Sequence, residues 1–295
     1  MKFGSTDNPE NIEFNLPQDH PETKKVLSKY KSNNLPEMYV GCAKWNKADL
    51  KGFYPKGTKD ELEYYSRQFN SIELNATFYR IFPAEQFASW YEKTPKGFKF
   101  FPKLNQEISH WKRLQETKEV VENYLYNASN LKEKLGTIFL QMHDNFAPKD
   151  FDRVVTFVED WPKEIPLAVE FRHTKWYNDE DVAKELYQLL ETNNVSNVIV
   201  DTAGRRDLLH MRLTNATAFI RYVGANHTSD YDRLDAWIER LKDWKSQGIK
   251  EVDFFIHQNI EKESPLLSAY FIKKLNSELG YSIKIPNEED DNTLF

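Results

Sequence analysis

Short apolar runs alternate with amphipathic stretches along most of the chain. Eight runs are typical of buried strands, and they cover residues 38–43, 71–76, 98–103, 137–142, 167–171, 197–201, 218–223 and 252–257. Between them, apolar residues recur at helical spacing, as Val182, Leu186 and Leu190 do within the segment 178–194. Strand–helix alternation is typical of parallel sheets, and eight such units in about 250 residues match a barrel. We therefore predict an α/β fold, a TIM (β/α)₈ barrel.

The helices expected between these strands follow from the same periodicity. They cover residues 22–30, 58–69, 83–94, 115–134, 148–161, 178–194, 231–244 and 265–279. Thr58 and Glu61 have the spacing of a capping box at the start of their helix. A doubly wound open sheet is the alternative fold. No glycine-rich fingerprint follows the first strand, which disfavours that alternative.

The two ends of the chain differ from its middle. Residues 1–36 are polar and contain several prolines, so we expect an N-terminal extension with one short helix. Residues 285–295 form an acidic C-terminal tail. The segment between them, residues 37–284, is expected to be a single barrel domain.

Composition restricts the class of protein. Of the 295 residues, 40% are hydrophobic and 14% aromatic, which is enough for one large core. The 46 acidic and 40 basic residues give a net charge of −6. This balance does not support nucleic acid as a partner, although a local basic patch could still bind it.

The single cysteine, Cys42, excludes a disulfide within the chain and fits a reducing cytoplasm. The first residues have no apolar stretch of the signal-peptide kind, and no run reaches the roughly 18 apolar residues of a membrane span. We expect a cytoplasmic protein with no membrane partner. Cys42 lies inside a predicted strand and is expected to be a small buried hydrophobe.

Polar side chains gather at the carboxyl ends of the predicted strands. Because residues two apart share a face of a strand, the late positions of each strand can be identified. They are Glu73, Asn75, Lys103, Gln141, His143, Glu170, Arg172, Asp201, Arg221 and His257. In barrels this end carries the active site. Unpaired buried charge costs several kcal/mol, so the set predicts a functional cluster, while a purely structural role is the alternative for each member alone.

The residue types suggest roles. Carboxylates can act as general acids, bases or nucleophiles, and the candidates are Glu73, Glu170 and Asp201. Cationic, polar and aromatic groups could hold a substrate, and these are Trp45, Asn75, Tyr79, Lys103, Arg172, His173, Trp176 and Arg221. The aromatic members could equally be core residues. A divalent metal is a possible cofactor, with His143 and His257 joining Glu73, Glu170 and Asp201 as ligands.

Several catalytic signatures are absent from the sequence. There is no HExxH zinc helix, no GxxxxGK[ST] loop, no GxSxG elbow and no calcium loop. Gly224, after the seventh strand, is the one place where a barrel-type phosphate site could form, and a single glycine is weak support.

The phrases "YVGCAKWNKADLKGFYPKG", "FNSIELNATFYRIFPAEQFASWYEKTPKGFKFFPK", "LAVEFRHTKW" and "VDTAG" resemble the YecE-like family, the domain of unknown function 72. The resemblance covers about residues 38–280. It implies a TIM barrel and no established activity. It also implies a pocket made by Glu73, Asn75, Tyr79, Glu170, Arg172, His173, Trp176 and Asp201. The chain departs from the family pattern at Gln141–His143 and at Ile256–Asn259, and these departures add two histidines.

Three functions fit these residues. The first is a hydrolase acting on a phosphoester or nucleic-acid-derived substrate, with arginines holding the phosphate. The second is a metal-free glycoside hydrolase or sugar enzyme with Glu73 and Glu170 as paired carboxylates. The third is a non-catalytic protein that binds a small anion through Arg172 and Arg221. The expected partner is therefore a small-molecule or phosphorylated substrate.

Overall fold

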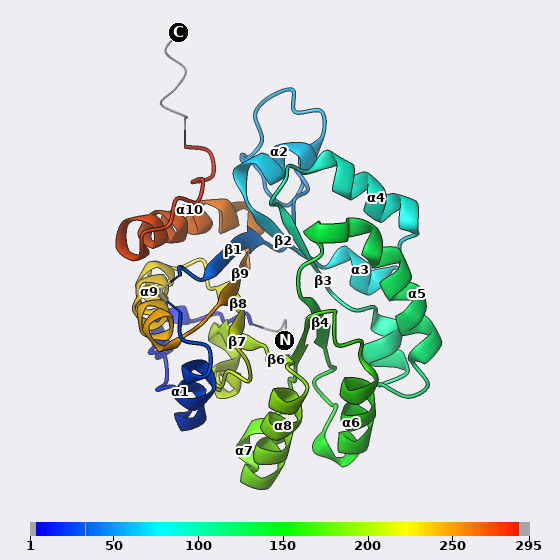
Figure 1. The fold of residues 1–295 in the computed structure, drawn as a ribbon. Coiled ribbons are helices and arrows are strands. Elements are labelled where there is room, and N and C mark those ends of the chain that lie inside the picture. The colour runs from blue at the N-terminus through cyan, green and yellow to red at the C-terminus, as the bar shows by residue number, and fades with distance from the viewer. Residues whose placement is uncertain (1–3, 33, 289–295) are drawn as a thin grey trace.

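Parallel strands and helices alternate along the chain in the computed structural model, which describes residues 4–32 and 34–288. The strands are β1 (Glu37–Cys42), β2 (Ser71–Leu74), β3 (Lys99–Pro102), β4 (Ile138–Gln141), β5 (Leu167–Glu170), β6 (Ser196–Asn197), β7 (Ile199–Thr202), β8 (Thr217–Gly224) and β9 (Glu251–Gln258). The α-helices are α1 (Pro21–Ser28), α2 (Glu61–Gln68), α3 (Ala76–Tyr79), α4 (Ala84–Lys93), α5 (Lys118–Ala128), α6 (Phe151–Asp160), α7 (Lys175–Asn178), α8 (Glu180–Thr192), α9 (Ser229–Gln247) and α10 (Ser264–Lys274). Figure 1 shows the helices as an outer layer around the strands.

The strands pair into three parallel sheets. Their orders are β1-β9-β8-β7, β2-β3 and β4-β5-β6. Strands β6 and β7 are the two halves of one predicted strand, divided at Val198, so this segment passes from one sheet to another. The predicted α/β class with parallel strands is confirmed, whereas the ladders do not close into a full barrel.

Side chains join β1 to β2, where no backbone ladder forms. The Asn70 amide donates to the Met38 carbonyl at 2.7 Å and accepts from the Val40 N–H at 2.9 Å. The two strands approach so closely here that a Cβ on Gly41 would lie 2.2 Å from the Ser71 carbonyl oxygen. This position therefore requires glycine. Between β3 and β4, isolated bridges replace a ladder, for example Lys103 with Phe139.

One apolar layer fills the space between the three sheets. Its members are Tyr39, Phe101, Phe139, Ala168, Val198, Val200, Phe219 and Phe255. Since side chains alternate along a strand, the next inward positions towards the carboxyl ends can be identified. They are Gly41, Glu73, Lys103, Gln141, Glu170, Thr202, Arg221 and His257. The interior therefore changes from apolar to charged at this end, which we call the mouth.

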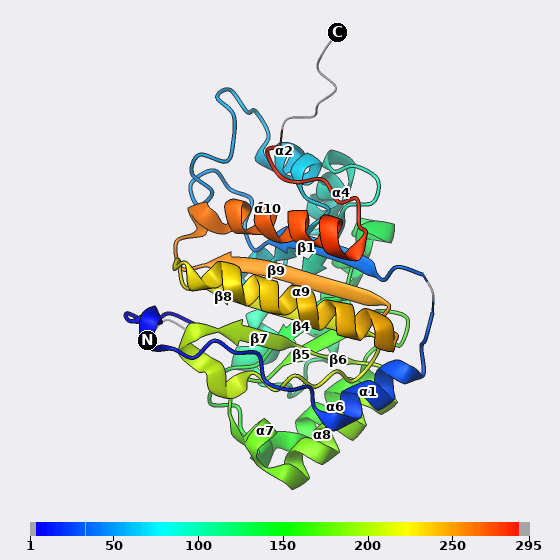
Figure 2. The ribbon, with the colours of Figure 1, turned by 90° about the vertical axis from the view of Figure 1, so that its left-hand side faces the viewer.

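The N-terminal extension packs where a barrel helix is missing. The connection from β7 to β8 contains a 3-10 helix, Ala203–Leu208, but no α-helix. The described part of the extension begins beside the end of β7, where Thr202 donates to the Gly4 carbonyl at 3.0 Å. It then runs back beside α9 to α1, and Thr23 donates to the Met211 carbonyl at 3.2 Å (Figure 2). A segment before the first strand thus covers part of the outer face.

Several predicted boundaries are wrong. Asp60, and not Thr58, caps α2, since the Asp60 carboxylate accepts from the Glu63 N–H. The predicted helix 115–134 ends at Ala128 and continues as a 3-10 helix. There, Ser129 and Asn130 bond to the Tyr126 carbonyl and compete with regular helix hydrogen bonds.

Two further sequence predictions concern the ends and the membrane. Most of the predicted acidic tail, residues 289–295, lies outside the described residues, as do residues 1–3 and 33 of the extension. Within residues 4–32 and 34–288, no helix is long and apolar enough to cross a membrane.

Candidate functional site

Arg221 lies at the centre of the charged cluster in the mouth. From β8 its guanidinium donates to both carboxylate oxygens of Glu73 on β2, at 2.9 and 2.8 Å. Its third nitrogen donates to Glu170 on β5 at 2.6 Å. Arg221 thus links strands of all three sheets, and the hydrogen bonds are of the strong, charge-assisted kind.

Further donors occupy the two buried carboxylates. Glu73 also accepts from the Asn75 amide at 2.6 Å and lies 3.1 Å from His257 Nε2. Glu170 also accepts from Arg172 Nε at 2.5 Å. Both carboxylates are therefore held by several donors, and they are almost completely buried.

These contacts keep the carboxylates ionised. Burial alone would raise the pKa of Glu73, but the charges of Arg221 and His257 outweigh burial and hold that pKa well below its usual range. At Glu170 burial is likewise outweighed by Arg172 and Arg221, and the pKa falls to about 2. The same carboxylates raise the pKa of Arg221 above its ordinary value, against the opposing effect of burial. Neither glutamate is suited to donate a proton at neutral pH.

Lys103 has a different environment. Its ammonium donates to the Gln141 side chain at 2.9 Å and lies 4.0 Å from the centre of the Phe78 ring. Among the described residues, no carboxylate oxygen lies within 4 Å of it. Burial, followed by the charge of Arg221, lowers its pKa from 10.5 to about 7. Lys103 is therefore a buried amine that is largely deprived of a counter-ion.

A wall of rings borders this amine. Phe78 contacts the His110 ring at 4.9 Å between centroids, and His110 contacts His143 at 5.2 Å. Burial and the neighbouring cation of Lys103 lower the pKa of His110 to about 4, so His110 is neutral. His143 lies further out and is 2.7 Å from the exposed Asp144.

Asp201 is not part of this cluster. It lies between the inward positions Val200 and Thr202, and its side chain points outward to α9. There it accepts from Arg233 at 2.8 Å and from the Trp237 indole at 2.7 Å, and it pairs with Arg206. Asp201 therefore ties β7 to a helix and to the neighbouring loop.

Three aromatic candidates and His173 also lie away from the charged centre. Trp176 is fully buried, and its indole donates to the Phe146 carbonyl at 2.7 Å. Tyr79 is 72% exposed on α3, because β2 ends at Leu74, before the predicted strand end. Trp45 packs edge-on against Trp90. His173 accepts from the Lys175 N–H at the start of α7.

The proposed metal ligands do not come together. Glu73 and Glu170 are occupied by arginines, Asp201 faces outward, and His143 pairs with a surface carboxylate. Among residues 4–32 and 34–288, no group of three His, Cys, Asp or Glu side chains could hold a metal ion. The donor set that the sequence suggested therefore does not fit a divalent metal.

The barrel-type phosphate position at Gly224 is filled by protein groups. The Ala225 and His227 N–H groups donate to the Asp230 carboxylate, and the Asn226 N–H donates to Gln258. A Cβ on Gly224 would lie 2.4 Å from the Gln258 side chain. Asp230 thus takes the backbone donors that an anion would need.

Cys42 is fully buried, and burial raises the pKa of its thiol to about 12, as expected for an inert hydrophobe.

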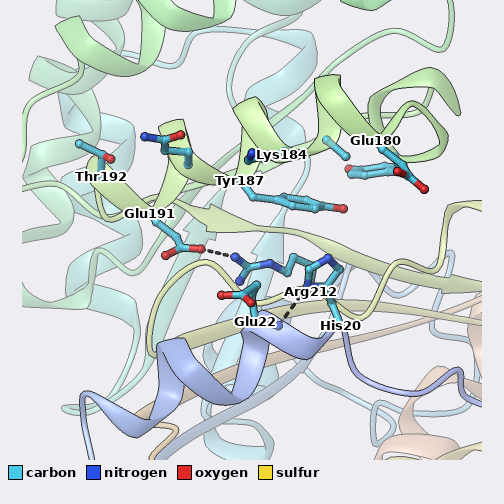
Figure 3. Close-up of a pocket in the computed structure, with 11 residues that line it drawn as sticks. His20, Glu22, Glu180, Lys184, Tyr187, Glu191, Thr192 and Arg212 are labelled. Carbon is cyan, nitrogen blue, oxygen red and sulfur yellow. Dashed lines mark hydrogen bonds and ion pairs between the residues drawn. The ribbon is translucent and has the colours of Figure 1, made fainter.

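A separate cavity of about 610 Å³ lies on the outer side, between α8 and the start of α1 (Figure 3). Its buried cation, Arg212, pairs with Glu191 and lies over the Tyr187 ring. His20 and Glu22 of the extension form the opposite side. No residue of the mouth cluster lines this cavity.

Three residues of the mouth received no role from the sequence. Gln141 joins Lys103 to Arg221, which lies 3.4 Å from its oxygen. The sequence placed Gln141 in the predicted cluster by its late position in the fourth strand, but its residue type suggested no role. Phe78 and His110 come from short helices after β2 and β3, and no periodicity in the sequence locates them.

Comparisons with known proteins agree with this architecture. The family described as "Protein of unknown function DUF72" matches residues 39–290. The UPF0759 protein YecE of Escherichia coli K12 is 27% identical over 280 residues, covering 88% of this chain and all of that protein. The UPF0759 protein YunF of Bacillus subtilis is 27% identical over 150 residues, covering 48% of this chain and 52% of that protein.

Solved structures show the same fold. A DUF72 family protein from Thermotoga maritima superposes with a TM-score of 0.67 at 26% identity, covering 81% of this chain and 99% of that one. One from Enterococcus faecalis superposes with a TM-score of 0.68 at 20% identity, covering 86% of this chain and all of that one. Neither description assigns an activity.

Proposed function

Because this chain belongs to the DUF72 family of unknown function, we propose its function from the mouth alone: it binds a small anion at the carboxyl ends of its strands. We further propose that the eight strand units act together as a TIM-type barrel around this site. The observation that carries the proposal is the charge balance. Arg172, Arg221 and Lys103 face two carboxylates, and Arg221 already engages both of them.

The excess positive charge lies towards solvent. The Arg172 side chain is 16% exposed, whereas Glu73 and Glu170 are almost completely buried. A carboxylate or phosphate group entering the mouth would therefore meet the Arg172 guanidinium before either carboxylate. Such pairing is strongest for guanidinium groups in a partly desolvated site.

Titration calorimetry with sulfate tests this proposal, because sulfate keeps its charge across the neutral range. We expect one site, and about tenfold weaker binding after Arg172→Gln, which corresponds to about 1.4 kcal/mol. Arg67→Gln, on the exposed face of α2, is the control and should bind like the wild type. An anion favours protonated Lys103, so affinity should fall as the pH rises above about 7. Equal affinity in all three proteins would contradict the proposal.

A second candidate, hydrolysis of a phosphoester, is favoured by one contact. Glu73 lies 3.1 Å from His257 Nε2, an arrangement in which a carboxylate orients a histidine base. We expect slow cleavage of bis(p-nitrophenyl) phosphate in the presence of chelator, lost in His257→Gln. Complete absence of turnover in the wild type would exclude this reaction for that substrate class.

The glycoside hydrolase hypothesis has less support. Such enzymes need one carboxylic acid that stays protonated near neutral pH. Both candidate glutamates have lowered pKa values, because arginines pair with them.

A further inference from the structure

Three features of the Lys103 environment bear on its chemistry. Its side chain ends inside the mouth, and the residue is only 8% exposed. The cations Arg221 and Arg172 disfavour its charged form, and the carboxylates Glu170 and Glu73, which the arginines already engage, oppose this effect only in part. Its nitrogen makes one hydrogen bond, to Gln141, and rests on the face of an aromatic ring.

Within residues 4–32 and 34–288, one other lysine is buried, and it shows what a structural role requires. Lys134 is 5% exposed, and its ammonium donates to the Tyr91 carbonyl, the Thr94 carbonyl and the Thr94 hydroxyl. These three acceptors match the three donors of an ammonium group. Lys103 has no comparable set, so the surroundings of Lys103 favour an amine with an available lone pair.

We propose that Lys103 is a nucleophile that forms a Schiff base with a small carbonyl compound bearing an anionic group, such as a 2-oxo acid. This inference rests on the proposed anion site, because Arg172 would hold the anionic group while Lys103 attacks the carbonyl carbon. A desolvated lysine beside another cation is a known means of activating such a nucleophile.

The reaction balances without an oxidant or reductant. The Lys103 lone pair forms a new N–C bond, and the π electrons of the carbonyl move to its oxygen. The resulting carbinolamine loses that oxygen as water, which takes both hydrogens of the amine and leaves a C=N bond. Protonation of the nitrogen then gives an iminium ion, which withdraws electrons from the substrate.

Pyruvate with sodium cyanoborohydride is the probe. Cyanoborohydride delivers hydride to the iminium carbon and leaves a stable secondary amine on the lysine. After digestion and mass spectrometry, we expect the reduced pyruvate adduct on the Lys103 peptide and none on the Lys134 peptide of the same sample. Acetone, a neutral carbonyl compound of similar size, should label Lys103 at least tenfold more slowly.

Two variants and a pH series complete the test. Lys103→Met should abolish the adduct, and Arg172→Gln should reduce it by about tenfold. In the wild type, labelling should rise with pH around a midpoint near 7, well below the midpoint of an exposed lysine. The pH series keeps the inference testable even if a variant does not fold.

The outcomes separate the inference from the proposed function. Labelling confined to exposed lysines, or a pH midpoint near 10.5 for the labelling of Lys103, would show that Lys103 is not an activated nucleophile. Calorimetry with sulfate would still test the anion site independently. If the wild-type protein neither bound sulfate nor gave a Lys103 adduct, both proposals would be wrong. A Lys103 adduct that needs the pyruvate carboxylate and Arg172 would support both.

Discussion

Arg221 binds Glu73 through two parallel hydrogen bonds, from Nε to Oε2 at 2.9 Å and from Nη2 to Oε1 at 2.8 Å. The two residues are 148 positions apart in the chain and lie on strands of different sheets. This pair connects parts of the molecule that no backbone ladder joins directly.

Arg221→Met should strongly destabilise the fold. It would leave two buried carboxylates without their main partner, and breaking a buried pair costs about 3–5 kcal/mol. Urea unfolding at pH 7 measures the loss. The triple variant with Glu73→Gln and Glu170→Gln should recover much of it, since the unpaired charges are then gone. A loss below about 1 kcal/mol for Arg221→Met alone would show that the pair is not structurally important.

Stability should fall in acid because of Glu170. Its pKa is about 2 in the folded protein and 4.5 ordinarily, so the folded state binds fewer protons. The ionised Glu170 therefore adds roughly 3 kcal/mol to the free energy of unfolding. This contribution is fully present above about pH 4.5 and is lost as the pH falls towards 2. Unfolding free energies between pH 6 and 2.5 should decline less steeply in Glu170→Gln. If the free energy of unfolding declined equally with pH in the wild type and in Glu170→Gln, the lowered pKa of Glu170 would be wrong.

Asp253→Asn should stabilise the protein at neutral pH. Asp253 is fully buried at the opposite end of the interior, and neither carboxylate oxygen has a hydrogen-bond partner. Burial, followed by the charges of Glu251 and Glu37, raises its pKa well above 3.8, although Thr137 and Lys99 oppose this. Above pH 3.8 the unfolded chain releases a proton that the folded chain keeps, so the native acid loses stability with rising pH.

The gain from this substitution should therefore be near zero at pH 3 and about 1–3 kcal/mol at pH 7.5. Asp201→Asn is the matched control, because Asp201 is equally buried but satisfied by Arg233 and Trp237. We expect Asp201→Asn to destabilise the protein at pH 7.5. Thermal unfolding at both pH values distinguishes the two carboxylates, and a destabilising Asp253→Asn at pH 7.5 would refute the assignment.

Asp19→Ala should loosen the N-terminal extension. Asp19 accepts from the Trp244 indole at 2.8 Å and pairs with Arg240, both on α9. Losing these contacts should cost about 2 kcal/mol and should speed cleavage of the extension in limited proteolysis. Asp7→Ala, at an exposed position of the same extension, is the control. Unchanged proteolysis in Asp19→Ala would mean that other contacts suffice to hold the extension.

The sequence by itself determined the order and type of most elements. Alternating apolar runs and helical stripes identify strands and helices because burial requires these two periodicities. The period of two also places Glu73, Lys103, Glu170, Arg221 and His257 at the mouth, where the structure brings them together.

Only the tertiary structure decided which charges pair and which face outward. Asp201 is one position out of phase with Val200 and Thr202, and its partners on α9 lie more than 30 residues later in the chain. Tyr79 lies on a short helix because β2 stops early, and the Asn70 side chain replaces a ladder between β1 and β2. Such features depend on contacts between distant segments, and local periodicity carries no information about those contacts.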